Sequence, residues 1–171
     1  ASKDLVSDVT LFDHMPATLE SFSISITNIR CEWQTWILRA IPQMPKLYTF
    51  IVSIDNPTPE DQEGDLSYLR LLPSSVRELG ILVGKNVKIE LDSFSHLPPK
   101  LHPLLIFPPS PYNDTLQLTD EHLKELPKAL TCLSIDFVCG LTPGVISLFP
   151  PALTDISFHK GNLKHPQTAI A

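Results

Sequence analysis

Short stretches of alternating apolar and polar residues recur along the chain and predict β-strands. Each stretch follows the pattern apolar-x-x-apolar-x-apolar, and the pattern occurs six times. Because successive side chains of a strand point to opposite faces, the last two apolar residues of each copy share one face. The apolar positions are Leu19, Phe22, Ile24; Leu47, Phe50, Val52; Val76, Leu79, Ile81; Leu101, Leu104, Ile106; Leu130, Leu133, Ile135; and Leu153, Ile156, Phe158.

An apolar residue followed by proline precedes each of the six predicted strands. These prolines lie 29, 28, 25, 29 and 23 residues apart. Proline cannot extend a helix and disfavours helical geometry in the residue before it, so each one is expected to end a helical segment and turn the chain toward the next strand. The pairs are Met15-Pro16, Met44-Pro45, Leu72-Pro73, Leu97-Pro98, Leu126-Pro127 and Phe149-Pro150.

The segments between the strands have helical character. Residues Thr119 to Leu126 offer a cap at Thr119, acidic residues in the first turn and apolar residues three apart, before Pro127. Four other segments occupy the same place ahead of a repeat proline and are expected to be helical too. They are Glu32 to Ile41, Asp65 to Leu71, Asp92 to His96 and Pro143 to Leu148.

The repeated segments, such as MPATLESFSI, LPSSVRELGI and LPKALTCLSI, resemble the leucine-rich repeat family over nearly the whole chain. The resemblance implies an α/β fold, a solenoid with a curved parallel sheet on its concave face and short helices and loops on its convex face. Residues 1–171 would form one domain, as part of a longer array or assembly. One feature departs from the family: asparagines 28, 56 and 162 stand one residue later than its usual asparagine, so the turn after the strand is expected to differ.

Three regions do not follow the repeat closely. Pro103 falls inside the fourth strand, which is therefore expected to be short or locally detached, with an irregular loop through Asn113 after it. The acidic, proline-rich residues 55–65 are expected to form a surface loop or a docking loop. Residues 163–171 lack a helical pattern that could cap the solenoid, so the chain is expected to be part of a longer array or to be capped at this end by a partner chain.

The strand positions between the core residues form three columns on the opposite face of the sheet, and these columns supply the candidate binding site. The middle turns present apolar residues there, while the later turns present an acid and a histidine. A group of apolar residues surrounded by polar ones is typical of a protein-binding surface. Two alternatives stay open: a register shift at Pro103 that turns Leu105 and Phe107 inward, or cover by another segment. The candidate partner-binding residues are Ile51, Leu82, Leu105, Phe107, Asp136 and His159.

Composition narrows the class of function. The 171 residues carry a net charge of −6, which disfavours nucleic acid and anionic membranes as partners because both attract Lys and Arg. No run approaches the roughly 18 consecutive apolar residues of a membrane span. A cytoplasmic protein is therefore expected, although Asn113-Asp114-Thr115 fits the pattern for N-glycosylation and keeps secretion open.

Known catalytic motifs are missing from the sequence. It contains no phosphate-binding glycine loop, zinc-protease helix or nucleophile elbow. Cys132 and Cys139 are spaced unlike zinc ligands, and Ser93, Ser95 and His96 lack an evident acidic partner. We therefore expect no enzyme activity, cofactor, metal or small-molecule substrate.

Two functions follow from these expectations. The first is a non-enzymatic module that binds a partner protein through the concave sheet face. The second is a structural subunit, or a segment of a larger assembly, that contacts its neighbours through the ends of the solenoid.

Overall fold

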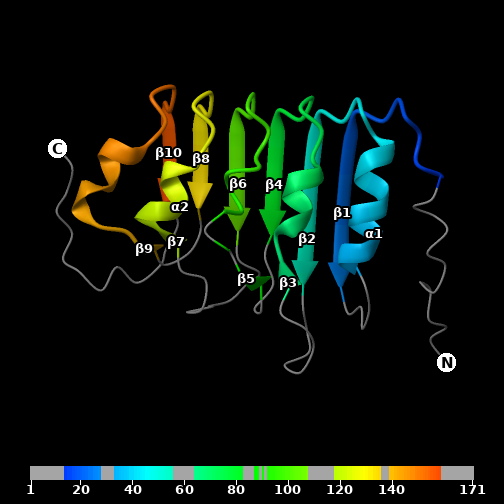
Figure 1. Ribbon diagram of the computed structural model, residues 1–171, viewed down its shortest axis with the longest axis horizontal. Helices are drawn as coiled ribbons and strands as arrows, with labels where there is room; N and C mark the ends of the chain where they lie inside the picture. The colour runs from blue at the N-terminus through cyan, green and yellow to red at the C-terminus, as the bar shows by residue number, and fades with distance from the viewer. Residues whose placement is uncertain are drawn as a thin grey trace.

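A computed structural model describes residues 14–27, 33–55, 64–82, 87–88, 90, 92–107, 118–135 and 139–158. Its centre is one sheet of six parallel strands, all pointing the same way in Figure 1. All six predicted strands are present and follow each other across the sheet in chain order, and the predicted α/β class is confirmed. The strands are β1 (Ser21–Thr27), β2 (Thr49–Asp55), β4 (Glu78–Leu82), β6 (Pro103–Phe107), β8 (Cys132–Ile135) and β10 (Asp155–Phe158).

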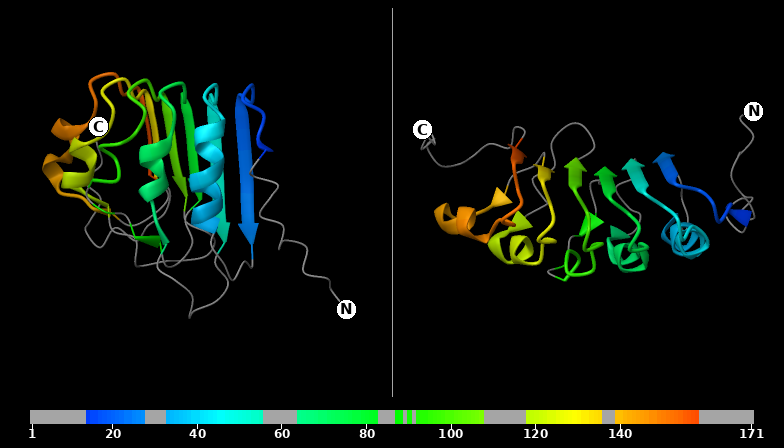
Figure 2. Two further views of the ribbon diagram at one scale, coloured as in Figure 1. Left: turned by 45° about the vertical axis from the view of Figure 1, so that its right-hand side comes forward. Right: turned by 90° about the horizontal axis from the view of Figure 1, so that it is seen from above.

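Short helical segments lie along one face of this sheet, as Figure 2 shows from above. Those whose bounds fall within the described residues comprise two α-helices and three 3-10 helices, the latter labelled η. Within the described ranges no helix has the length and apolar character needed to cross a membrane. The segments are α1 (Trp33–Ala40), η2 (Ile41–Gln43), η3 (Ser67–Leu71), α2 (Asp120–Lys124) and η4 (Pro143–Leu148).

The sequence prediction missed two details on this helical side. Residues 92–96 form turns rather than the expected helix, because the Ser93 hydroxyl accepts the backbone N–H of Glu90 and the Ser95 hydroxyl donates to the Asp92 carbonyl. The second detail is two additional pairs of short parallel strands, which join neighbouring segments between the strands of the main sheet. These are β3 (Gly64–Asp65) with β5 (Val87–Lys88), and β7 (Leu118–Thr119) with β9 (Cys139–Gly140).

The core lies between the sheet and the helical segments. In the four middle strands, every apolar position predicted from the repeat is buried. These side chains form one cluster with Ile37 of α1, Tyr68 of η3, Leu123 of α2 and Phe94. Burying a side chain of this size contributes about 1.5–3 kcal/mol. The burial of one strand's apolar side chains therefore depends on the neighbouring strands and on the helical segment that packs against them.

Each repeat proline begins a tight turn that leads into its strand. In five copies the proline carbonyl accepts the N–H of the residue three positions later, as from Val76 to Pro73 at 3.0 Å. The second copy has one residue fewer, so the Met44 carbonyl takes this role for Leu47. The turn orients the chain for the strand, which explains why proline recurs here.

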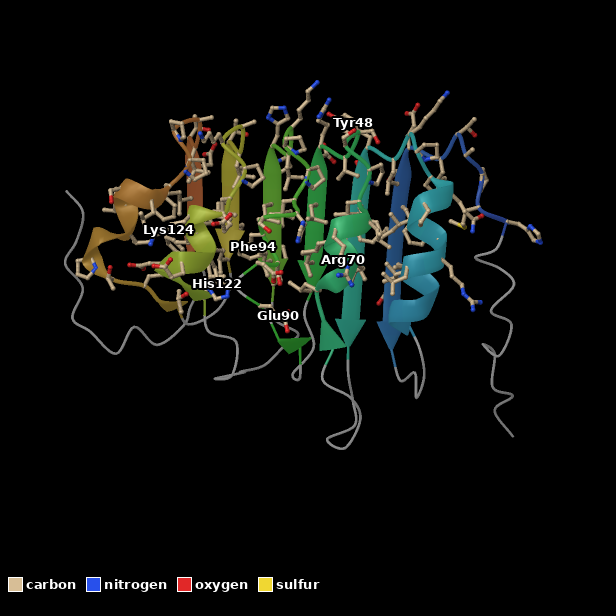
Figure 3. The ribbon with its side chains drawn as sticks, viewed as in Figure 1. Tyr48, Arg70, Glu90, Phe94, His122 and Lys124 are labelled. Carbon is tan, nitrogen blue, oxygen red and sulfur yellow. The ribbon has the colours of Figure 1, made fainter. Side chains whose placement is uncertain are left out.

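A row of backbone hydrogen bonds joins the starts of all six strands. The N–H just before each strand donates to the carbonyl of the matching residue in the previous turn, over 2.6–3.0 Å. The accepting carbonyls belong to Glu20, Tyr48, Arg77, His102 and Thr131. Figure 3 shows Tyr48 at this upper end of the sheet. The same hydrogen bond therefore sets the alignment of each strand with the strand before it.

The prediction that Pro103 shortens or detaches the fourth strand is wrong. Strand β6 runs over five residues and pairs with both β4 and β8. In the other turns the accepting carbonyl takes two N–H groups, as Glu20 does from Tyr48 and Thr49. Pro103 has no N–H to donate to the Arg77 carbonyl. This carbonyl still accepts the His102 N–H at 2.9 Å, so it keeps a hydrogen-bond partner.

Candidate functional site

The strand residues that point away from the helical segments form what we call the open face of the sheet. Its first column contains Ser21, Thr49, Glu78, Pro103, Cys132 and Asp155, and its second contains Ser23, Ile51, Gly80, Leu105, Ser134 and Ser157. The third aligns Ser25, Ser53, Leu82 and Phe107. The columns match the predicted ones, and the register is continuous through Pro103. The alternative in which Leu105 and Phe107 turn inward is therefore wrong.

Four predicted binding residues come together on strands β2, β4 and β6. Leu105 and Ile51 lie on either side of Gly80 in the second column, and Leu82 lies opposite Phe107 in the third. The four side chains are half-buried rather than freely exposed, because neighbouring strands about 4.8 Å away cover their flanks. We call Ile51, Leu82, Leu105 and Phe107 the apolar group.

Gly80 shapes this group by having no side chain. A Cβ atom placed on Gly80 would lie 3.3 Å from Cγ1 of Ile51, which is closer than ordinary van der Waals contact. The Ile51 side chain therefore lies against the backbone of β4, and Gly80 itself is buried. As a result, Ile51 extends across the centre column toward the strand that carries Leu105. The sequence columns showed Gly80 as a gap and could not indicate that Ile51 fills it.

Polar side chains flank the apolar group in the first column. Thr49 Oγ1 donates to Glu78 Oε2 at 2.9 Å, and Thr154 Oγ1 donates to Asp155 Oδ2 at the same distance. The Cys132 thiol is free and half-buried between Pro103 and Asp155. The first column contains two acids, Glu78 and Asp155, and no described position in the three columns is Lys or Arg. Asp136 and His159, the other predicted binding residues, fall outside the described residues.

A second polar cluster lies on the helical side, near Phe94, His122 and Lys124 in Figure 3. His122 is buried, and its ring meets Phe94 edge-on with centroids 6.1 Å apart. Its Nδ1 accepts the Thr119 backbone N–H at 3.2 Å and lies 2.8 Å from Thr119 Oγ1. This arrangement caps α2, with histidine in the place that Glu or Gln usually takes. The predicted cap at Thr119 is confirmed, and the cluster has a structural role.

Asp120, the first residue of α2, connects this helix to the next helical segment, η4, by hydrogen bonds. Thr142 donates to the Asp120 carboxylate from its hydroxyl and also from its backbone N–H, the latter at 3.0 Å. These two hydrogen bonds hold the pKa of Asp120 below its ordinary value, and the bond from the Thr142 hydroxyl has the larger effect. The carboxylate thereby links α2 to the start of η4.

Three exposed apolar residues lie at the β10 end of the sheet, away from the apolar group. Ile156 and Phe158 occupy core-facing positions, yet 43% and 51% of their surfaces are exposed. Ile146 of η4 is 60% exposed. The prediction about the end of the solenoid concerns residues 163–171, which lie outside the described residues, and it stays a prediction.

Metal-ligating side chains do not gather in the part of the chain that the structure describes: no three His, Cys, Asp or Glu residues there could hold an ion together. Cys139 lies in the two-residue strand β9. The hydroxyls of Ser93 and Ser95 are engaged with nearby backbone groups in the turns of residues 92–96.

Comparison of the chain with protein-family models, with curated proteins and with solved structures gives no match. The candidate site is therefore defined by its geometry alone.

Proposed function

We propose that this chain is a non-enzymatic module of the leucine-rich repeat type, a solenoid that binds a partner protein through the open face of its sheet. The proposal is supported by six parallel strands in chain order, each entered through a hydrogen-bonded turn at a repeat proline. In the part of the chain that the structure describes, the helical segments lie on the other face of the sheet (Figure 2). The open face would be the concave surface that such solenoids use for binding.

The apolar group is the single observation that carries this proposal. Four half-exposed apolar side chains lie together in the middle of a face whose first strand presents Ser21, Ser23 and Ser25. Binding surfaces commonly combine an apolar centre with a polar surround that stays partly hydrated. The residual exposure of these side chains would be removed by a partner that packs across β2, β4 and β6.

Charge on the open face favours one chemistry for the partner. Glu78 and Asp155 lie in the first column, and no described position of this face supplies a cation to pair with them. The partner segment is therefore expected to contribute apolar side chains to the apolar group and Lys or Arg to these acids. Electrostatic complementarity of this kind orients partners and accelerates association.

A pull-down from the native source tests the proposal. The wild-type chain is compared with the double variant Leu82→Arg, Leu105→Arg, and bound proteins are identified by mass spectrometry. The matched control is Ser21→Arg, Ser157→Arg, which adds the same charge to the open face at positions that lie opposite Thr49 and Ser134 rather than opposite a member of the apolar group. We expect a partner that is lost only with the first variant, while both variants keep the wild-type thermal unfolding. An unchanged set of partners would refute binding through the apolar group.

A second candidate function is favoured by Ile156 and Phe158. Their exposure at core-facing positions suits a subunit that contacts its neighbours through the ends of the solenoid. The same pull-down with Phe158→Lys tests this candidate, because it predicts loss of a neighbour that the Leu82→Arg, Leu105→Arg variant retains.

A further inference from the structure

The edge of the sheet at β10 presents an apolar surface that the other turns bury. Ile156 lies opposite Leu133, and Phe158 lies opposite Ile135, in the regular register of the sheet. Leu133 and Ile135 on β8 are fully buried, because β10 covers them from one side and β6 from the other. Within the described residues, β10 has a neighbouring strand on one side only. One more strand in the same register would bury Ile156 and Phe158 in the same way.

The backbone of β10 is arranged to receive such a strand. The Asp155 N–H points toward β8, where it donates to the Thr131 carbonyl at 3.0 Å. Because backbone groups alternate along a strand, those of Ile156 and Phe158 point to the unpaired edge. The Thr154 carbonyl is next in the row of accepting carbonyls, and no described residue donates to it.

The opposite edge of the sheet, at β1, has the complementary groups. Ser21 occupies the same column as Thr49, Cys132 and Asp155, whose N–H groups all donate to the preceding turn. The N–H groups of Ser21 and Ser23 therefore point to the outer edge of β1 and have no neighbouring strand among the described residues. On the core side, β1 presents Phe22 and Ile24, which are only half-buried.

We infer that β10 of one molecule pairs in parallel with β1 of a second copy of this chain. In the register that the sheet repeats at every junction, Ser21 lies opposite Asp155, Phe22 opposite Ile156, and Ile24 opposite Phe158. The Thr154 carbonyl then accepts N–H groups of Glu20 and Ser21, just as the Thr131 carbonyl accepts those of Thr154 and Asp155. Serine side chains meet Asp155 and Ser157 on the open face, so no like charges oppose each other.

This junction joins two different edges, so each added copy leaves one β10 edge and one β1 edge available. Such head-to-tail contacts build open chains, or rings where the rotation closes, rather than two-fold dimers. The inference rests on the second proposed function and names the neighbour as another copy of the same chain.

Sedimentation velocity over a wide range of protein concentration tests the inference. The wild-type chain is expected to grow beyond two copies, while Phe158→Lys and Ser23→Pro each remain at 19.1 kDa. Proline at position 23 removes an N–H from the outer edge of β1 and leaves the Phe22 and Ile24 bonds to β2 in place. Two controls are expected to associate as the wild type does: Ser157→Lys, on the open face of β10, and Ser21→Pro, in the column where Pro103 already occurs.

Mixing the two blocked variants gives the sharpest result. Phe158→Lys keeps an intact β1 edge and Ser23→Pro an intact β10 edge, so their mixture is expected to form a species of two copies and no larger. Wild type that stays monomeric, association that either variant retains, or a mixture that stays monomeric would overturn the inference. A monomeric wild type whose pull-down still loses a protein with Phe158→Lys would identify a different neighbour, whereas an unchanged pull-down would remove the end-contact function as well.

Discussion

Leu133 and Ile156 lie directly opposite each other on neighbouring parallel strands, yet Leu133 is fully buried and 43% of Ile156 is exposed. Both residues occupy the same position of the repeat. Their difference arises because Leu133 has a strand on either side, whereas Ile156 has one only among the described residues. Burial in this fold is therefore set by the neighbouring turns as much as by the repeat pattern.

This pair gives the first prediction. Leu133→Ala is expected to lower the free energy of unfolding by about 2–5 kcal/mol, because it leaves a cavity in a closed part of the core. Ile156→Ala is expected to cost under about 1 kcal/mol at protein concentrations where the chain is monomeric, because much of the side chain already contacts solvent. Urea unfolding of both variants measures the difference. Equal losses would show that β10 is as closely covered as β8.

Pro103 gives a prediction about one amide. In Pro103→Ala the new backbone N–H is expected to donate to the Arg77 carbonyl, as the N–H groups of Thr49 and Cys132 do to their own acceptors. Hydrogen exchange of the amide introduced by this substitution is then slow, and the free energy of unfolding changes by less than about 1 kcal/mol. Rapid exchange at this amide would contradict the shared-acceptor explanation for the regularity of β6.

His122 is expected to stabilise the chain as a helix cap. In His122→Leu the Thr119 backbone N–H loses its acceptor, and the loss of a cap costs about 1 kcal/mol. His122→Gln keeps an acceptor at the position that the capping box requires and is expected to retain more of the stability. Thermal unfolding of the two variants compares them; the cap assignment fails if Gln is no better than Leu.

Asp120 links stability to pH through Thr142. Because the folded-state pKa of Asp120 is lowered, its stabilising contribution is present above the ordinary pKa of 3.8 and is lost as pH falls through the lowered value. Thr142→Val removes the hydroxyl bond, so the pKa of Asp120 is expected to rise toward its ordinary value. Carboxyl chemical shifts followed by NMR during acid titration measure this change. An unmoved pKa would assign the effect to another group.

Much of the sheet could be predicted from sequence because the same residue pattern recurs before and within every strand. A proline turn, a buried leucine position and two inward apolar positions recur together, and the columns of the open face follow from strand alternation. The apolar group could be located in this way through Ile51, Leu82, Leu105 and Phe107. Its geometry could not, because the contact of Ile51 with Gly80 depends on the side chain that Gly80 lacks.

The errors came from hydrogen bonds that a residue pattern does not encode. Pro103 was expected to disrupt a strand, but a carbonyl shared between two donors tolerates the loss of one. Residues 92–96 were expected to be helical, but the hydroxyls of Ser93 and Ser95 bind nearby backbone groups in a turn. In both places local hydrogen bonding determined the structure.

Site-specific photo-crosslinking tests the central claim, that the open face binds a partner protein, most directly. A photoreactive amino acid replaces Leu105 in the apolar group or, as control, Leu71, an exposed apolar residue of η3 on the helical side. Each protein is irradiated in extract from the native source, and the mass and identity of the adducts are determined. We predict a discrete partner adduct from position 105 and none from position 71. An adduct from position 71 with none from position 105 would contradict binding through the open face.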